Sequence, residues 1–125
     1  MKRLLVHSVL LLSLLAGNHA FSADFQKGLY AYKTGNYGKA FREFLSLAEQ
    51  GDIRAQVNLG VMYENGQGTT KDYVHAYMWW NFAASQGNKT AEKFKNIIEK
   101  KLSPTDISIA HRLARECVEK GYKNC

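Results

Sequence analysis

The feature that most constrains the fold is a segment whose pattern returns after 36 residues. The phrase "AEQGD" at 48–52 is followed by "ASQGN" at 84–88. The same offset joins residues of like character, namely Tyr37 with Tyr73, Ala40 with Ala76, Phe41 with Tyr77, Phe44 with Trp80, Ala48 with Ala84, and Ala55 with Ala91. A fixed period of about 20–50 residues is typical of repeat proteins, in which each unit buries its apolar face against the next. The sequence therefore predicts a stack of repeated units.

Apolar residues inside this period recur every three or four positions, which is the spacing of one helix face. Helices are expected over 25–34, 37–50, 53–64, 72–86, 89–101 and from Ser103 up to Gly121. In the fifth, Ala91, Phe94, Ile97 and Ile98 are expected to face inward. The last begins with Ser103-Pro104-Thr105-Asp106, which offers a cap, a proline at the first position and a capping-box acid. No stretch alternates with period two, so the predicted fold class is all-α, a short α-solenoid of about six antiparallel helices.

The N-terminal residues 1–22 are those of a secretory signal peptide. Lys2 and Arg3 precede an apolar stretch from Leu4 to Ala16, and small residues follow it. Cleavage near Ser22 or Ala23 fits the small-residue preference at such sites. A membrane anchor is the alternative, although the apolar stretch of about 13 residues is short against the roughly 20 that a bilayer requires. We expect an exported chain, periplasmic or secreted, with no membrane span after cleavage.

Residues 23–125 then form one helical repeat domain, with a degenerate repeat at 25–51, a complete repeat at 52–87 and a C-terminal cap at 88–125. Removing Lys2 and Arg3 leaves 15 basic against 11 acidic residues, a net charge of about +4. So small an excess, on an exported chain, does not indicate a nucleic-acid binder. We expect a protein or peptide partner instead.

Two cysteines, Cys117 and Cys125, lie near the C-terminus. In an exported protein an even pair is read as a disulfide, with two free thiols as the alternative. The bridge would pin the C-terminal cap by closing a loop of about nine residues, which stabilises the fold by about 2.5 kcal/mol on the chain-entropy model. Two cysteines alone cannot form a four-ligand zinc site.

The sequence carries no motif that points to catalysis, a cofactor or a metal. Gly66-Gln67-Gly68 lacks the further glycines and the Lys-Ser/Thr of a phosphate loop, so it is a helix connection. His75 and His111 have no histidine or cysteine at the spacing of a metal site. A Gly-x-Ser-x-Gly nucleophile elbow does not occur. We therefore expect a protein that is not an enzyme.

Four aromatic residues are the candidate partner contacts. Trp79 and Trp80 are adjacent and cannot share one helix face. Trp80 matches Phe44 in the repeat register and is assigned to the core, so Trp79 is expected to be half exposed and to contact a partner. Tyr32, Tyr63 and Tyr73 are expected to line a concave face, where their hydroxyls could bond the backbone of an extended peptide.

The complete repeat resembles the SEL-one-like repeat family, a tetratricopeptide-type helical repeat. The resemblance rests on "AQVNLGVMYENGQG", "KDYVHAYMWWNFAASQG" and Ala91. The matching structural positions are Ala55, Leu59, Gly60, Met62, Tyr63, Gly66, Gly68, Asp72, Tyr73, Ala76, Trp79 or Trp80, Ala83, Ala84 and Gly87. The C-terminal "LSPTDISIAHRLARE" is similar to the tail of small exported members. The resemblance implies right-handed stacking of helix pairs and an adaptor role, and it implies no catalytic residue.

The predicted function is therefore that of a non-catalytic adaptor or scaffold, which binds a protein or peptide in the exported compartment. The alternative is weak β-lactam binding or hydrolysis, as in cysteine-rich members of the family that carry a cysteine pair at eight-residue spacing in each repeat. Here only Cys117 and Cys125 have that spacing. A third hypothesis is a purely structural or toxin-antidote protein, which a homodimer burying the Trp79 face would favour.

Overall fold

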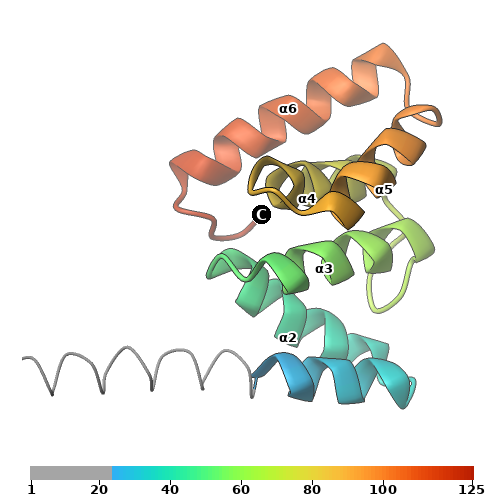
Figure 1. Cartoon of the computed structure of the whole chain (residues 1–125), viewed down its shortest axis with the longest axis vertical. Coiled ribbons are helices and arrows are strands. Elements are labelled where there is room, and N and C mark those ends of the chain that lie inside the picture. Colours follow the sequence, from blue (N-terminus) through green and yellow to red (C-terminus); the bar gives the residue numbers. More distant parts are fainter. Residues whose placement is uncertain (1–23) are drawn as a thin grey trace, which may run out of the picture.

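The fold is seen in a computed structural model of the chain, which describes residues 24–125. Residues 24–33 are helical, and five helices follow: α2 (Tyr37–Glu49), α3 (Ile53–Asn65), α4 (Tyr73–Ser85), α5 (Lys89–Glu99) and α6 (Pro104–Glu119). Figure 1 shows them stacked along the long axis of the molecule, from the blue N-terminal helical residues up to α6. No strand occurs among the described residues, and the predicted all-α fold of six helices is confirmed. The predicted signal peptide lies outside them.

The two matching phrases "QGD" and "QGN" form the same turn twice. After α2, the N–H of Asp52 donates to the carbonyl of Leu47 at 3.0 Å, and after α4 the N–H of Asn88 donates to Ala83 at 3.1 Å. Gly51 and Gly87 both have φ of 94°, as this helix ending requires. Asp52 and Asn88 then accept hydrogen bonds from the first turn of the next helix. The repeat in sequence is thus a repeated helix ending joined to a helix cap.

The start of α6 is the capping box that the sequence predicts. The hydroxyl of Ser103 accepts from the N–H of Asp106 at 3.1 Å, and the Asp106 carboxylate accepts from the N–H of Ser103 at 3.0 Å. Hydrogen bonding from the backbone N–H and then the side chain of Ser103 lowers the pKa of Asp106 below its ordinary value. The chain is therefore set to turn from α5 into a new helix at a defined residue.

Helix α4 lies between two groups of buried side chains. The first core joins the helical residues 24–33, α2, α3 and α4, and includes Phe44, Leu59, Met62 and Trp79. The second core joins α4 to α5 and α6, and includes Ala76, Trp80, Ala91, Ile98 and Ala110. Alanine has a small side chain, so helices can approach closely where it lies between them. Six alanines of the stack are fully buried, namely Ala40, Ala48, Ala55, Ala76, Ala83 and Ala91. Ala84 is only half-buried, beside the second core.

A disulfide pins the C-terminal end to the stack. Cys117 in α6 is bonded to Cys125, with their Cα atoms 5.4 Å apart, as predicted. Between them, the N–H of Asn124 donates to the Glu49 carboxylate of α2 at 2.9 Å. The Tyr122 ring lies 5.6 Å from that of Phe82 in α4. The tail from Gly121 to Cys125 therefore ties α6 to both α2 and α4.

Candidate functional site

The predicted contacts Tyr32 and Tyr63 pack against aromatic rings of neighbouring helices. The Tyr32 ring is 5.3 Å from that of Tyr37, and its hydroxyl donates to Gln67 at 3.1 Å. The Tyr63 ring meets Phe41 edge-on at 5.3 Å and stacks on His75 at 5.1 Å. Both tyrosines are half-buried and pack against the first core. Their rings are therefore engaged in packing between units.

An Asp72–His75 pair lies beside the Tyr63 ring. Asp72 caps α4, accepting from the N–H of His75 at 3.0 Å, and its other oxygen lies 2.7 Å from Nδ1 of His75. This contact favours a proton on Nδ1. Burial, and then the negative charges of Asp72 and Glu49, raise the pKa of Tyr63 to about 12. The pair therefore fixes the turn into α4.

His75 also lines a small cavity of about 120 Å³ beside the disulfide. Met78, Leu113, Glu116 and Lys120 contribute to its walls, together with Asn124 and the two bonded cysteines. The walls contain no serine or threonine, and both thiols are tied in the disulfide. The other histidine of residues 24–125, His111, is exposed on α6 and meets the Tyr77 ring at 5.7 Å. No three metal-ligating side chains come together within residues 24–125.

Tyr73, the third predicted tyrosine contact, is half-buried at the start of α4. Its ring packs beside the second core, and the ammonium groups of Lys71 and Lys101 lie 5.0 Å and 5.6 Å from its centre. The ring thus anchors two lysine side chains near the ends of neighbouring helices. No partner contact is needed to account for its position.

The expectation that Trp79 is half exposed is wrong, because its side chain is fully buried. The expectation assumed that α4 has one buried face. In the structure α4 packs against α3, α5 and α6, and seven of its residues are buried. Trp79 therefore enters the first core while Trp80 enters the second. Adjacent tryptophans point apart on a helix, and here each direction leads to a different core.

Trp80 occupies the core position that its register with Phe44 predicts. Its Nε1–H donates to the carbonyl of Val57 at 3.0 Å, and its ring lies 5.3 Å from that of Phe94. Gly60 of α3 lies directly beneath this ring, so that a Cβ there would collide with it. Gly68 has the same kind of role in the connection, where a Cβ would collide with the carbonyl of Tyr37. These repeat positions are explained by close packing.

A surface outside the four predicted aromatic contacts is the exposed side of α5. Ile97, expected to face inward, is 48% exposed, while its neighbour Ile98 is 1% exposed. Ile97 lies in a shallow pocket of about 440 Å³, whose lining defines the α5 face: Lys89, Glu92, Lys93, Asn96, Ile97 and Lys100. In the repeat register Ile98 matches Met62, which the structure buries, and Ile97 matches Val61, which it leaves half-buried.

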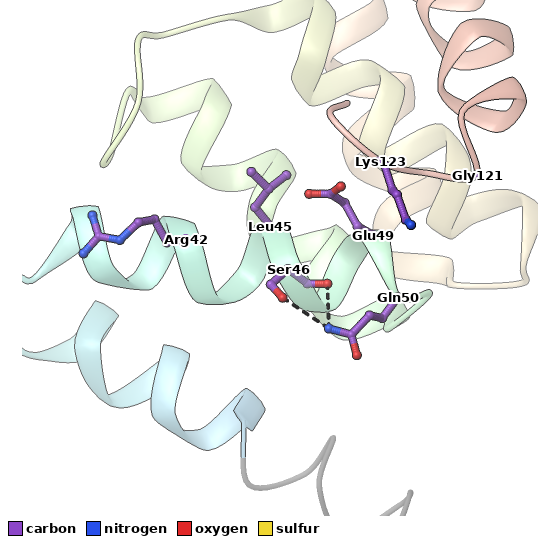
Figure 2. Close-up of a pocket in the computed structure, with 7 residues that line it drawn as sticks. All are labelled: Arg42, Leu45, Ser46, Glu49, Gln50, Gly121 and Lys123. Atoms are coloured by element: carbon purple, nitrogen blue, oxygen red, sulfur yellow. Dashed lines mark hydrogen bonds between the residues drawn. The ribbon is translucent and has the colours of Figure 1, made fainter.

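Two other pockets lie beside α2 and between α4 and α6. Figure 2 shows one of about 350 Å³, formed by Arg42, Leu45, Ser46, Glu49 and Gln50 of α2 with Gly121 and Lys123 of the tail. In it, Gln50 donates to the Ser46 carbonyl at 3.0 Å and lies 3.2 Å from the hydroxyl. The other, of about 490 Å³, lies between α4 and α6 and includes Phe82 and the exposed Val118. Neither gathers a set of groups suited to catalysis.

Comparison with known proteins places the complete repeat in a family. A family model described as the Sel1 repeat matches residues 53–88. Two Helicobacter pylori proteins provisionally named β-lactamase HcpE are 47% and 48% identical over 45 and 42 residues, which is 36% and 34% of this chain. Those stretches span only 13% and 12% of the HcpE chains.

A solved structure is similar over much more of the fold. It is that of a protective antigen present in uropathogenic Escherichia coli strains, and its title gives it an SLR fold. The match has a TM-score of 0.73 and 30% sequence identity, covering 86% of this chain and 25% of the other. The present chain thus spans about a quarter of that protein. Residues 53–88 are therefore a Sel1 repeat, and the helices around them complete an SLR fold.

Proposed function

We propose that the chain is a non-catalytic adaptor, periplasmic or secreted, which binds a segment of another protein on its α5 face. Helical repeat proteins present extended surfaces that bind other proteins, and the Sel1 repeat is a helical repeat of this kind. The disulfide supports export, because such bonds persist in oxidising compartments. Among residues 24–125, no helix has the length and apolar character needed to cross a bilayer.

The observation that carries the proposal is the different exposure of two equivalent residues. Val61 of α3 packs beside the second core, to which α5 contributes Ala91 and Ile98. Ile97 occupies the same position of the next unit, 36 residues later, and is 48% exposed. The described residues therefore leave about half of this apolar side chain uncovered. A partner that covered Ile97 would gain the burial that Val61 already has.

The test is selection of peptides from a random display library by the purified, oxidised chain, followed by affinity measurements on the selected peptides. Ile97→Ser should weaken their binding by about fivefold or more, since an apolar anchor is lost. Val118→Ser is the matched control, because Val118 of α6 is 49% exposed and should leave binding unchanged. A library that yields no binder, or binders equally sensitive to both changes, contradicts the proposal.

A second candidate function follows from the name of the HcpE relatives. If their provisional assignment applied to this chain, the Asp72–His75 pair would be the nearest approach to a base. That pair opens on a cavity without a hydroxyl or free thiol, and the shared stretch is a small part of HcpE. A chromogenic cephalosporin assay decides the matter. Turnover that His75→Ala abolishes would establish this function against the adaptor.

A further inference from the structure

Resting on the proposed function, we propose that the partner segment is an acidic amphipathic helix, which lies along α5 with an apolar side chain on Ile97. The α5 face is where a following repeat would place its first helix, because the corresponding face of α3 packs toward the second core. A helix is therefore the element that this place in the fold is shaped to receive. The charges on α5 then select which helix fits.

The α5 face differs from its equivalent on α3 in a way that favours a charged occupant. Val57 and Val61 of α3 are both half-buried beside the second core. The residues 36 positions later are Lys93 and Ile97, both exposed. The apolar residue Val61 thus corresponds to another apolar residue, Ile97, whereas Val57 corresponds to the cation Lys93. On this face Ile97 is the one apolar side chain among polar and charged lining residues.

Much of the net positive charge of the described residues lies on this helix together with Lys100 and Lys101, which follow it. Residues 89–101 carry five lysines and two glutamates, a formal charge of +3, whereas residues 24–125 together carry 15 basic and 11 acidic residues, or +4. Lys89 pairs with Glu92 at 3.7 Å, and Lys101 lies over the Tyr73 ring. Lys93, Lys95 and Lys100 form no ion pair with any described residue. Of these, Lys93 and Lys100 line the α5 face and are available to carboxylates of a partner, whereas Lys95 is half-buried and does not line it.

The same face disfavours a phosphate-rich or lipid partner. Glu92 and Asn96 line it together with the lysines, and Glu92 would repel a nucleic-acid backbone. Helix α5 has no arginine for bidentate phosphate contacts. One exposed isoleucine is too little apolar surface to hold a helix in a membrane interface. Carboxylates around one apolar anchor match Lys93, Lys100 and Ile97, and Asn96 can bond a polar side chain of the partner.

The experiment classifies the selected peptides and measures their affinity by fluorescence anisotropy. We expect peptides rich in Asp and Glu around a Leu, Ile or Phe at helical spacing. Lys93→Glu with Lys100→Glu should weaken them by about tenfold or more at low salt. Lys93→Arg with Lys100→Arg should retain binding. Arg42→Glu with Arg115→Glu is the control. Arg42 in α2 and Arg115 in α6 are both exposed and form no ion pair in the described part of the chain.

The outcomes separate this inference from the proposed function. Selected peptides that need Ile97 but are neutral, or that ignore the lysine reversal, overturn the acidic helix and leave the adaptor standing. A failure to select any peptide overturns both. Phosphatidylglycerol vesicles and duplex DNA serve as competing probes, and equal binding of either one through Lys93 and Lys100 also overturns the inference. Circular dichroism should show helix gained by the peptide on binding, and an extended bound peptide counts against it.

Discussion

Helices α4 and α5 are neighbours in sequence and in space, yet they are buried to very different extents. Seven of the 13 residues of α4 are buried, against two of the 11 residues of α5. The two helices meet where Trp80 of α4 packs on Phe94 of α5, and both contribute to the second core. The difference teaches that the residues that identify the repeat are used for packing in α4. The exposed residues, Ile97 among them, lie on α5, which follows the complete repeat.

The physical reason is the number of neighbours. Helix α4 packs against α3, α5 and α6, so it must be apolar around most of its circumference. Helix α5 packs chiefly on α4 and keeps a narrow apolar stripe. The C-terminal tail then covers part of α4 again through Tyr122 and Phe82. Helix α5 receives no such cover from the described residues.

The largest effect expected from this comparison is that of Trp80→Ala in α4. The change removes a buried indole and its hydrogen bond to Val57, so the free energy of unfolding should fall by about 4 kcal/mol. Urea unfolding followed by circular dichroism measures it. A loss below about 1 kcal/mol would mean that α4 is not held as tightly as described.

Gly60→Ala tests the contact between α3 and α4 from the other side. The added methyl would push the Trp80 ring away and break its bond to Val57, which should cost about 2–3 kcal/mol. Gly38→Ala is the control, because the nearest atom to its Cβ would be 3.6 Å away, in Arg42. Since Gly38 lies in α2, its substitution should instead stabilise by up to about 1 kcal/mol. Equal effects of the two changes would contradict the close packing at Gly60.

Removing the disulfide tests the cover on the far side of α4. Cys117→Ser with Cys125→Ser should lower the free energy of unfolding by about 2.5 kcal/mol, because the unfolded chain regains the freedom of that loop. Reduction of the native chain should have the same effect in a thermal unfolding scan. Peptide binding on α5 should not change, and a parallel loss of binding would show that the two sides are coupled.

Alkaline pH should loosen the start of α4 through Tyr63. Its pKa is raised to about 12 in the folded chain, against 10.0 ordinarily, so the unfolded chain ionises first. Stability due to the neutral hydroxyl is therefore full below pH 10 and is lost as pH rises toward 12. Tyr63→Phe should reduce this loss in unfolding experiments between pH 8 and 12. Tyr30→Phe, at an exposed ring, should leave the loss as it is.

The smallest effect on stability is expected from Ile97→Ala in α5. The side chain is half exposed, so the free energy of unfolding should change by no more than about 0.5 kcal/mol. Affinity for selected peptides should nevertheless fall several-fold, in contrast with Trp80→Ala. A stability loss above about 1 kcal/mol would show that Ile97 belongs to the core after all.

Much of the fold could be predicted because its determinants are local. Gly51 with Asp52, and Ser103 with Asp106, specify helix ends through hydrogen bonds among near neighbours. Cys117 and Cys125 are the two cysteines of the sequence, so a disulfide in an exported chain has a single possible pairing. The exposure of Trp79 and Ile97 could not be predicted, since it depends on which helices pack against α4 and α5. Helical spacing tells which residues share a face, but not how many faces are covered.

The amino-acid sequence by itself determined the helices, their turns, the period of 36 residues and the disulfide, because each depends on short-range geometry or a fixed register. Only the tertiary structure decided that both tryptophans are core residues and that Ile97 is not. The reason is that burial depends on neighbours brought from elsewhere in the chain. Helix α4 has such neighbours around most of its circumference, whereas α5 is left with one side open.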